Sequence, residues 1–145
     1  MRHLITLAAL GAALSAQAAP TPQAAVEQFL RFELDGGRLQ PWPFQKYLAV
    51  AAGYEEPGWD QVHLVEAWKA GEPRCAANRC KVTVSFTYAP TAKMGAEQVV
   101  PHPDGGTEQV DYVAVQKDGQ WLLESSNGIP RVSAAVMDKM LRDGL

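Results

Sequence analysis

The chain has 145 residues, of which 13 are Lys or Arg and 16 are Asp or Glu, so its formal net charge is −3. Nucleic acid or an anionic membrane surface would require a broad basic face, and the only dense basic cluster, Arg74, Arg79 and Lys81, flanks a predicted turn. The composition therefore argues against a protein that binds nucleic acid.

The first 18 residues have the three parts of a secretory signal peptide. Residues 2–3 form a short basic end, residues 4–14 are apolar or uncharged, and residues 16–18 read Ala-Gln-Ala, a small-x-small cleavage site. The apolar run is too short to span a bilayer, so we expect cleavage, no membrane anchor afterwards, and a periplasmic or secreted location. Residues 19–145 are then expected to form a single domain.

A first helix is predicted to begin at Thr21, a suitable N-cap, with Pro22 at the first helical position. Gly36-Gly37 is expected to end it. A second, shorter helical segment is predicted from Phe44 to Ala52, after the break at Pro41-Trp42-Pro43. The apolar stripe of the first helix recurs at three- and four-residue spacing and comprises Ala25, Val26, Phe29, Leu30 and Leu34.

Two strands are predicted on either side of a cysteine pair. Lys81–Tyr88 alternates polar and apolar residues, which is typical of a strand with one buried face, and Gln61–Trp68 is a less regular partner for antiparallel pairing. Cys75 and Cys80 lie between them, and in an oxidising compartment we expect them to form a disulfide. A metal site or a redox-active pair is less favoured, because further ligands are absent nearby in the sequence and four residues separate the two thiols.

A β-hairpin is predicted where Asp118-Gly119 separates the strands Gln109–Gln116 and Trp121–Ser125. The preceding region is expected to be a long loop, with a short strand at Gln98-Val99-Val100 as an alternative. A last helix is predicted from Arg131 to Asp143. The predicted fold class is α+β, with N-terminal helices packed on a curved antiparallel sheet of at least four strands and with a C-terminal helix.

Three of these segments carry a resemblance to a known family: the opening helix Ala24–Arg31, the strand Val82–Tyr88 and the hairpin Gln116–Leu123. Their order resembles the nuclear transport factor two-like superfamily, which has a cone-shaped α+β fold, over most of residues 19–145. The resemblance implies a pocket where the first helices cross the concave face of the sheet. It leaves the activity open, since that superfamily includes isomerases, dehydratases and cyclases alongside non-catalytic domains.

A curved sheet covered by helices leaves a concavity lined by alternate strand residues, and small-molecule sites are usually found in such places. Aromatic side chains are the candidate lining residues, although an aromatic residue on a strand more often packs in the core. The predicted ligand-binding residues are Trp42, Tyr47, Trp68, Tyr88 and Tyr112, with Phe29 and Phe86 as further liners.

His63 and Asp111 are the titratable residues on predicted strands and are therefore the candidate catalytic residues, with a pocket tyrosine as hydrogen-bond donor. Strand alternation directs Asp111 and Tyr112 to opposite faces, so the two cannot line one cavity. The loop segment His102-Pro103-Asp104 offers two metal ligands, which do not define a site. No metal or cofactor is predicted.

The favoured functional hypothesis is a non-catalytic protein of the cell envelope that binds a small apolar ligand or a partner protein through the concave pocket or the exposed sheet face. The alternative is a small acid–base enzyme of the isomerase or dehydratase type, acting on a small hydrophobic substrate in the pocket. A sheet that serves only as a homodimer interface is a third hypothesis. The sequence lacks the familiar signatures of serine hydrolases, nucleotide-binding loops and zinc proteases.

Overall fold

The computed structural model describes residues 18–40, 44–50, 54, 58–59, 61–89 and 106–144, apart from the side chains of residues 44 and 45. Four of the sequence predictions concern residues outside these ranges. They are the signal peptide up to residue 17, Trp42, the strand at 98–100, and the 102–104 segment.

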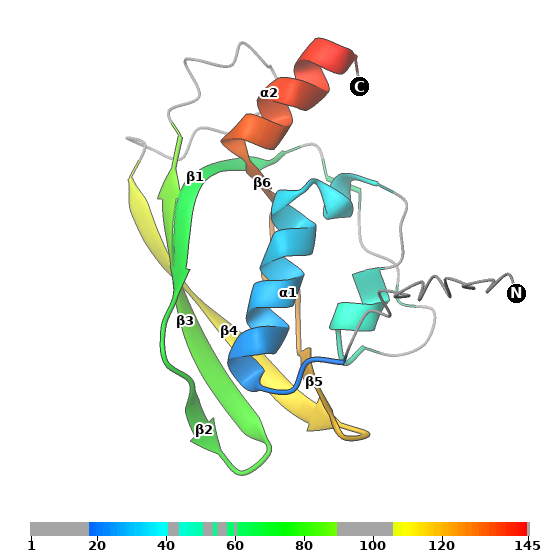
Figure 1. Cartoon of the computed structure of the whole chain (residues 1–145), viewed down its shortest axis with the longest axis vertical. Helices are drawn as coiled ribbons and strands as arrows, with labels where there is room; N and C mark the ends of the chain where they lie inside the picture. The colour runs from blue at the N-terminus through cyan, green and yellow to red at the C-terminus, as the bar shows by residue number, and fades with distance from the viewer. Residues whose placement is uncertain are drawn as a thin grey trace, which may run out of the picture.

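A six-stranded sheet curls around helix α1 (Pro22–Leu34), which lies against its concave face (Figure 1). Two short 3-10 helices, η1 (Gly37–Leu39) and η2 (Phe44–Tyr47), follow α1 in the chain, and helix α2 (Ala134–Asp143) lies at one end of the sheet. The predicted α+β fold class is confirmed. The strands are β1 (His63–Ala70), β2 (Arg74–Ala76), β3 (Arg79–Tyr88), β4 (Thr107–Lys117), β5 (Gln120–Leu123) and β6 (Arg131–Ser133).

The strand order is β5-β4-β3-β1-β6, and β2 pairs with β3 beside this path. All pairings are antiparallel except that of β1 with β6, in which Leu64 lies opposite Val132 in a parallel register. The parallel strand β6 occupies Arg131–Ser133, so the last helix begins at Ala134 and not at Arg131 as predicted. A three-residue strand is too short to produce a recognisable alternation of polar and apolar residues, so the sequence pattern did not reveal it.

Helix α1 begins and ends where the sequence predicts. The backbone N–H of Ala24 donates to Thr21 Oγ1 at 3.1 Å, and Pro22 occupies the first helical position. Beyond the other end, Gly36 has a φ of 84°, a left-handed conformation that glycine adopts without steric cost. The first helix prediction is therefore confirmed in both its caps.

The stripe of α1 fills the middle of the concave face. Val26, Phe29 and Leu30 are each 0% exposed and belong to one core cluster with Val84 and Phe86 of β3. Burial of each such side chain stabilises the fold by about 1.5–3 kcal/mol before the entropy cost is counted. The helix also contacts β1, β4, β5 and β6, so it occupies much of the space where an apolar pocket was predicted.

The predicted disulfide and the predicted hairpin turn are both confirmed. Cys75 and Cys80 are opposite each other in β2 and β3 and form a disulfide with an S–S distance of 2.09 Å. Asp118 and Gly119 have φ values of 51° and 78°, the two left-handed residues that a primed two-residue hairpin turn requires.

The second predicted helical segment is shorter than expected. In its described part, residues 44–50, only Phe44–Tyr47 is helical; Leu48 then forms a parallel bridge with Leu123 of β5, and the N–H of Ala49 donates to the Leu123 carbonyl at 2.8 Å. The chain here runs along the edge of β5, which explains why helix formation stops. Among the helices of the described ranges, none has the length and apolar character needed to cross a membrane.

Candidate functional site

The inner face of the sheet brings several of the predicted pocket residues into one aromatic array. Tyr88, Tyr112, Phe29 and Phe86 are at most 1% exposed, so they pack against one another and leave little of their surface for a ligand. The contacts run through Tyr47, Phe29, Tyr112, Phe86, Tyr88 and His63, with consecutive ring centroids 5.3 to 6.5 Å apart.

Two other predicted ligand-binding residues lie near the rim of this array. Trp68 of β1 is opposite Phe86 and is half-buried against the core. Tyr47 is also half-buried and lines, together with Trp121 and Lys46, a small concavity of about 180 Å³ beside the start of α1. A role of these aromatic residues in ligand binding stays a prediction.

A buried ionic cluster joins the end of α1 to β6. The Oε1 atom of Glu33 accepts hydrogen bonds from Nη1 of Arg38 at 2.5 Å and from the backbone N–H of Arg131 at 3.2 Å. The side chains of Glu33 and Arg38 are both 0% exposed. Arg38 also donates to the carbonyls of Ser126 and Gly128, at 3.3 and 2.6 Å, so it holds the loop before β6 in place.

Arg131 connects this cluster to the sheet. Its Nε atom donates to Tyr88 Oη at 3.1 Å, and Tyr88 Oη donates to Glu108 Oε2 at 2.5 Å. Nη2 of Arg131 lies 3.8 Å from the same Glu108 oxygen, and its guanidinium lies 4.9 Å from the centre of the Phe86 ring. Two guanidinium groups thus face two carboxylates, and the charges of the cluster are balanced.

Burial determines the protonation of this region. It raises the pKa of the Glu33 carboxyl above its ordinary value, against the opposing charges of Arg38 and Arg131. Burial and the hydrogen bond to Glu108 raise the pKa of Tyr88 to about 12, and burial also raises the pKa of Tyr112. Both tyrosines are therefore protonated hydrogen-bond donors at neutral pH.

The Tyr112 hydroxyl and Oε2 of Glu33 are buried on the inner face and have no hydrogen-bond partner among the described residues. Buried polar groups are normally paired, so an unpaired donor and an unpaired carboxylate oxygen are the feature of this face that most nearly suits a ligand or a proton transfer.

The structure separates the two candidate catalytic residues. The His63 ring contacts the ring of Tyr88 on the inner face, with centroids 5.3 Å apart. Asp111 lies on the outer face, where Thr83 Oγ1 and Lys81 Nζ approach its carboxylate at 2.6 and 3.0 Å. Asp111 and Tyr112 therefore point to opposite faces, as strand alternation predicts.

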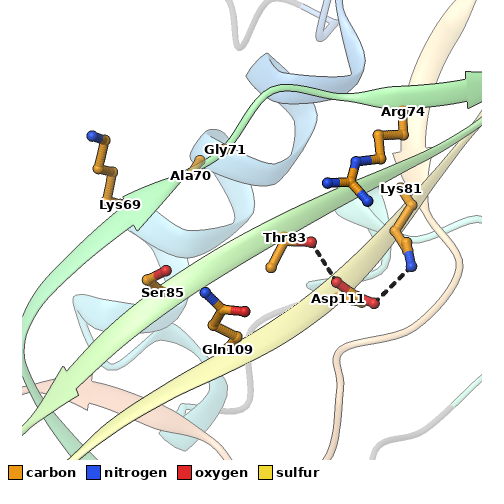
Figure 2. A pocket seen from close by; sticks show the side chains of 9 residues that line it. All are labelled: Lys69, Ala70, Gly71, Arg74, Lys81, Thr83, Ser85, Gln109 and Asp111. Atoms are coloured by element: carbon orange, nitrogen blue, oxygen red, sulfur yellow. Dashed lines mark hydrogen bonds and ion pairs between the residues drawn. The ribbon is translucent and has the colours of Figure 1, made fainter.

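The outer face of the sheet contains an open hollow of about 670 Å³, which we name the outer hollow (Figure 2). It crosses β1, β3 and β4 on the side of the sheet opposite to α1, and polar side chains form its floor. Its lining residues are Lys69, Ala70, Gly71, Arg74, Lys81, Thr83, Ser85, Gln109 and Asp111.

Positive charge exceeds negative charge in the outer hollow, although the chain as a whole has a net charge of −3. Lys81 is paired with Asp111, whose pKa is lowered by the hydrogen bonds from Thr83 and Lys81. Lys69 and Arg74 form no ion pair with any residue that the structure describes. The hollow therefore has two uncompensated cations above a floor of hydroxyl and amide groups.

Sequence reasoning missed most of both sites, but signals for each were present. Glu33 occupies the apolar stripe of α1, three and four residues after Leu30 and Phe29, where a charged residue predicts a buried partner. Thr83 lies on the strand face opposite Val82 and Val84, so alternation could have located the floor of the hollow.

No protein-family model matches the chain, and neither the curated proteins nor the solved structures include a significant match. Within the described residues, no group of three or more His, Cys, Asp and Glu side chains could hold a metal ion. A function must therefore be argued from the two faces of the sheet.

Proposed function

We propose that this protein is an exported, non-catalytic binding protein of the cell envelope that binds an anionic partner in the outer hollow. The observation that carries the proposal is the local excess of positive charge on an otherwise acidic chain. Opposite charge attracts a ligand from solution and raises its rate of association, so a cationic hollow on an acidic protein favours anionic partners.

The inner face offers less room for a partner. Its centre is packed with the side chains of α1, and its charged groups already neutralise one another. The outer face is open, and the polar and charged side chains that line its hollow do not belong to the core clusters. Binding there requires no rearrangement of the fold, which is the usual behaviour of a preformed interaction surface.

Two further observations concern the cellular location and the fold in this proposal. A disulfide between Cys75 and Cys80 is stable in an oxidising compartment, in agreement with the signal-like segment 1–18. The curled sheet around a leading helix agrees with the α+β fold class expected from the sequence, and the proposal keeps the predicted resemblance to the nuclear transport factor two-like superfamily, whose members include non-catalytic binding domains.

The chemistry of the hollow predicts moderate, salt-dependent affinity. An exposed ion pair contributes about 0.2–1 kcal/mol, so two or three such pairs account for a weak or multivalent interaction. Exposed charges are screened over about 8 Å at physiological ionic strength. Binding should therefore weaken as salt is added.

An NMR titration of the isotope-labelled protein tests the proposal with three anions: inorganic phosphate, a sulfated oligosaccharide and an acidic peptide. We expect at least one of them to shift the amide signals of Lys69, Arg74 and Thr83, and we expect the double variant Lys69→Glu/Arg74→Glu to lose this response. The matched control Arg31→Glu/Lys139→Glu changes the same charge at exposed positions of the two helices and should keep it. Shifts confined to the inner face, or none with any anion, would contradict the proposal.

A small acid–base enzyme is the second candidate function, and one observation favours it. The Tyr112 hydroxyl and Glu33 Oε2 are buried without hydrogen-bond partners among the described residues, and burial raises the pKa of Glu33, which favours its protonated, proton-donating form. Glu33 and Tyr112 join His63 as candidates on the inner face, whereas Asp111 lies on the outer face of the sheet.

Native mass spectrometry of the protein purified from the envelope distinguishes the two candidates. An enzyme with a hydrophobic substrate site should retain a small molecule that is lost in Tyr112→Phe and kept in Tyr54→Phe, which changes an exposed tyrosine outside the array. If neither the wild type nor either variant retains a small molecule, the result favours the binding function of the outer hollow. The same spectra report a homodimer, if one forms.

A further inference from the structure

We propose that the partner of the outer hollow is an acidic polypeptide segment that lies along β3 in an extended conformation, and that Asp111 is an internal competitor for the same cations. This inference rests on the proposed function, because it names the class of partner for that site. It makes Asp111 a residue that limits affinity and selects for partners with several carboxylates.

Asp111 is itself a carboxylate bound in the hollow. Its oxygens accept a hydrogen bond from Thr83 Oγ1 at 2.6 Å and face Lys81 Nζ at 3.0 Å, and both donors belong to the neighbouring strand (Figure 2). The pair is exposed, since the side chains of Lys81 and Asp111 are each 47% accessible to solvent. A carboxylate from another chain can therefore reach Lys81 and replace Asp111.

The two uncompensated cations lie at opposite ends of the hollow (Figure 2). Arg74 is opposite Lys81 in the sheet, and Lys69 is opposite Ser85. Lys81 and Ser85 are four residue steps apart on β3, which corresponds to about 13 Å along the strand. A ligand that meets both cations without drawing their side chains together must itself be extended, which favours a polyanion over a single phosphate or sulfate group.

An extended peptide has the same repeat as the floor of the hollow. Outward side chains recur at every second residue along β3, as Lys81, Thr83 and Ser85, which is a spacing of about 6.6 Å. Side chains on one face of an extended peptide repeat at the same distance. Carboxylates at positions i and i+4 of such a peptide can therefore lie at the level of Arg74 and Lys81 and at the level of Lys69.

The lining of the hollow favours a peptide over a polysaccharide. Its floor offers hydroxyl and amide groups from Thr83, Ser85 and Gln109, which can pair with a peptide backbone. None of the residues that line the hollow is aromatic, so a sugar ring has no flat apolar surface to pack on. Charge and hydrogen bonding are the only contacts available, and an acidic peptide satisfies both.

Fluorescence anisotropy with labelled octapeptides tests this inference on the whole protein. One probe alternates Ser and Glu, and the other has four Ser followed by four Glu, so the two have equal charge and different spacing. We expect the alternating probe to bind more tightly. Arg74→Ala and Lys69→Ala should each weaken its binding by about 2- to 5-fold, the range expected for one exposed ion pair.

Asp111→Asn is the decisive variant, because it retains an acceptor for Thr83 and removes the competing charge. We expect it to bind the alternating probe about 2- to 5-fold more tightly, whereas Asp138→Asn should leave binding unchanged. Asp138 is a matched control, since it too is an exposed aspartate in an ion pair, with Arg142 of α2 at 2.6 Å. Circular dichroism melting curves establish that each variant is folded.

Each outcome separates this inference from the proposed function. Weaker binding by Asp111→Asn, or no difference from Asp138→Asn, overturns the competitor role of Asp111. A response to phosphate or the sulfated oligosaccharide that depends on Lys69 and Arg74, with no response to the peptides, overturns the peptide partner and keeps the anion-binding function. The absence of binding to all of these anions overturns both proposals.

Discussion

The charged side chains on the two faces of the sheet differ in burial and in pairing. On the inner face, Glu33, Arg38 and Arg131 are almost completely buried, and together with Glu108 they form a network of two guanidinium groups and two carboxylates. On the outer face, Lys69 and Arg74 form no ion pair with the residues that the structure describes, and Arg74 contributes only at longer range to the lowered pKa of Asp111. Buried charges must be paired to be tolerated, whereas exposed charges cost little and stay available to a partner. We therefore expect stability to depend on the inner face and binding to depend on the outer face.

The largest expected effect is that of Glu33→Ala. The change would leave Arg38 and Arg131 buried without their shared carboxylate, and loss of one partner of a buried ion pair costs about 3–5 kcal/mol of unfolding free energy. Urea denaturation followed by circular dichroism measures this loss. Asp111→Ala is the matched change on the outer face and should stay within about 0.5 kcal/mol of the wild type. Similar losses in the two variants would remove the contrast between the faces.

The next largest effect concerns the disulfide that ends the β2–β3 hairpin. Replacing Cys75 and Cys80 together by Ser should cost about 2 kcal/mol, because the bridge closes a short loop and restricts the unfolded chain only modestly. Thermal unfolding of the double variant measures the change. The outer hollow begins at the neighbouring Arg74, so unaltered peptide binding in the folded variant would show that the bridge supports the fold and not the hollow.

A smaller effect is expected from pH, and it also differs between the faces. The pKa of Tyr88 is raised to about 12 from 10.0, so the unfolded chain loses this proton first and stability falls as the pH rises between these values. The lowered pKa of Asp111 acts in the other direction: its contribution is present above pH 3.8 and is lost as the pH falls through its folded value. We therefore expect Tyr88→Phe to lose less unfolding free energy than the wild type as the pH rises above 10.0, measured by denaturation at a series of pH values. An equal loss in the two proteins would contradict the raised pKa of Tyr88.

The smallest expected effect is that of Tyr112→Phe. The hydroxyl is buried and has no hydrogen-bond partner among the described residues, so its removal relieves an unsatisfied group and should change stability by less than about 1 kcal/mol. Urea denaturation measures the difference. A loss clearly above this limit would mean that the hydroxyl binds a partner in the folded protein, which would strengthen the case for a ligand on the inner face.

Local sequence signals predicted the parts of the fold that depend on neighbouring residues. The Thr21 cap, the turn at Asp118-Gly119 and the disulfide of Cys75 and Cys80 all follow from short-range geometry, and all three are confirmed. The strand β6 was missed, because its pairing with β1 joins residues more than 60 positions apart and leaves no periodic pattern in three residues.

The candidate sites were predictable only in part. The aromatic array was foreseen as a set of residues on the inner face, but its filling by α1 depends on how the helix sits in the curved sheet. The outer hollow combines Lys69, Arg74 and Gln109 from three strands, and no spacing in the chain relates them. Their proximity results from the register in which the strands pair, and this register cannot be predicted from a single sequence.

The amino-acid sequence by itself determined which segments form the leading helix and the two long hairpins, and which side of each strand is apolar, because caps, turns and alternation act within a few residues. Only the tertiary structure decided that Glu33 and Arg131 share one buried cluster and that Lys81 and Arg74 lie near Asp111 on the outer face, with Lys69 at the far end of the same hollow. Charges separated in sequence gain or lose partners according to which strands become neighbours, and that choice is made by the packing of the whole sheet around α1.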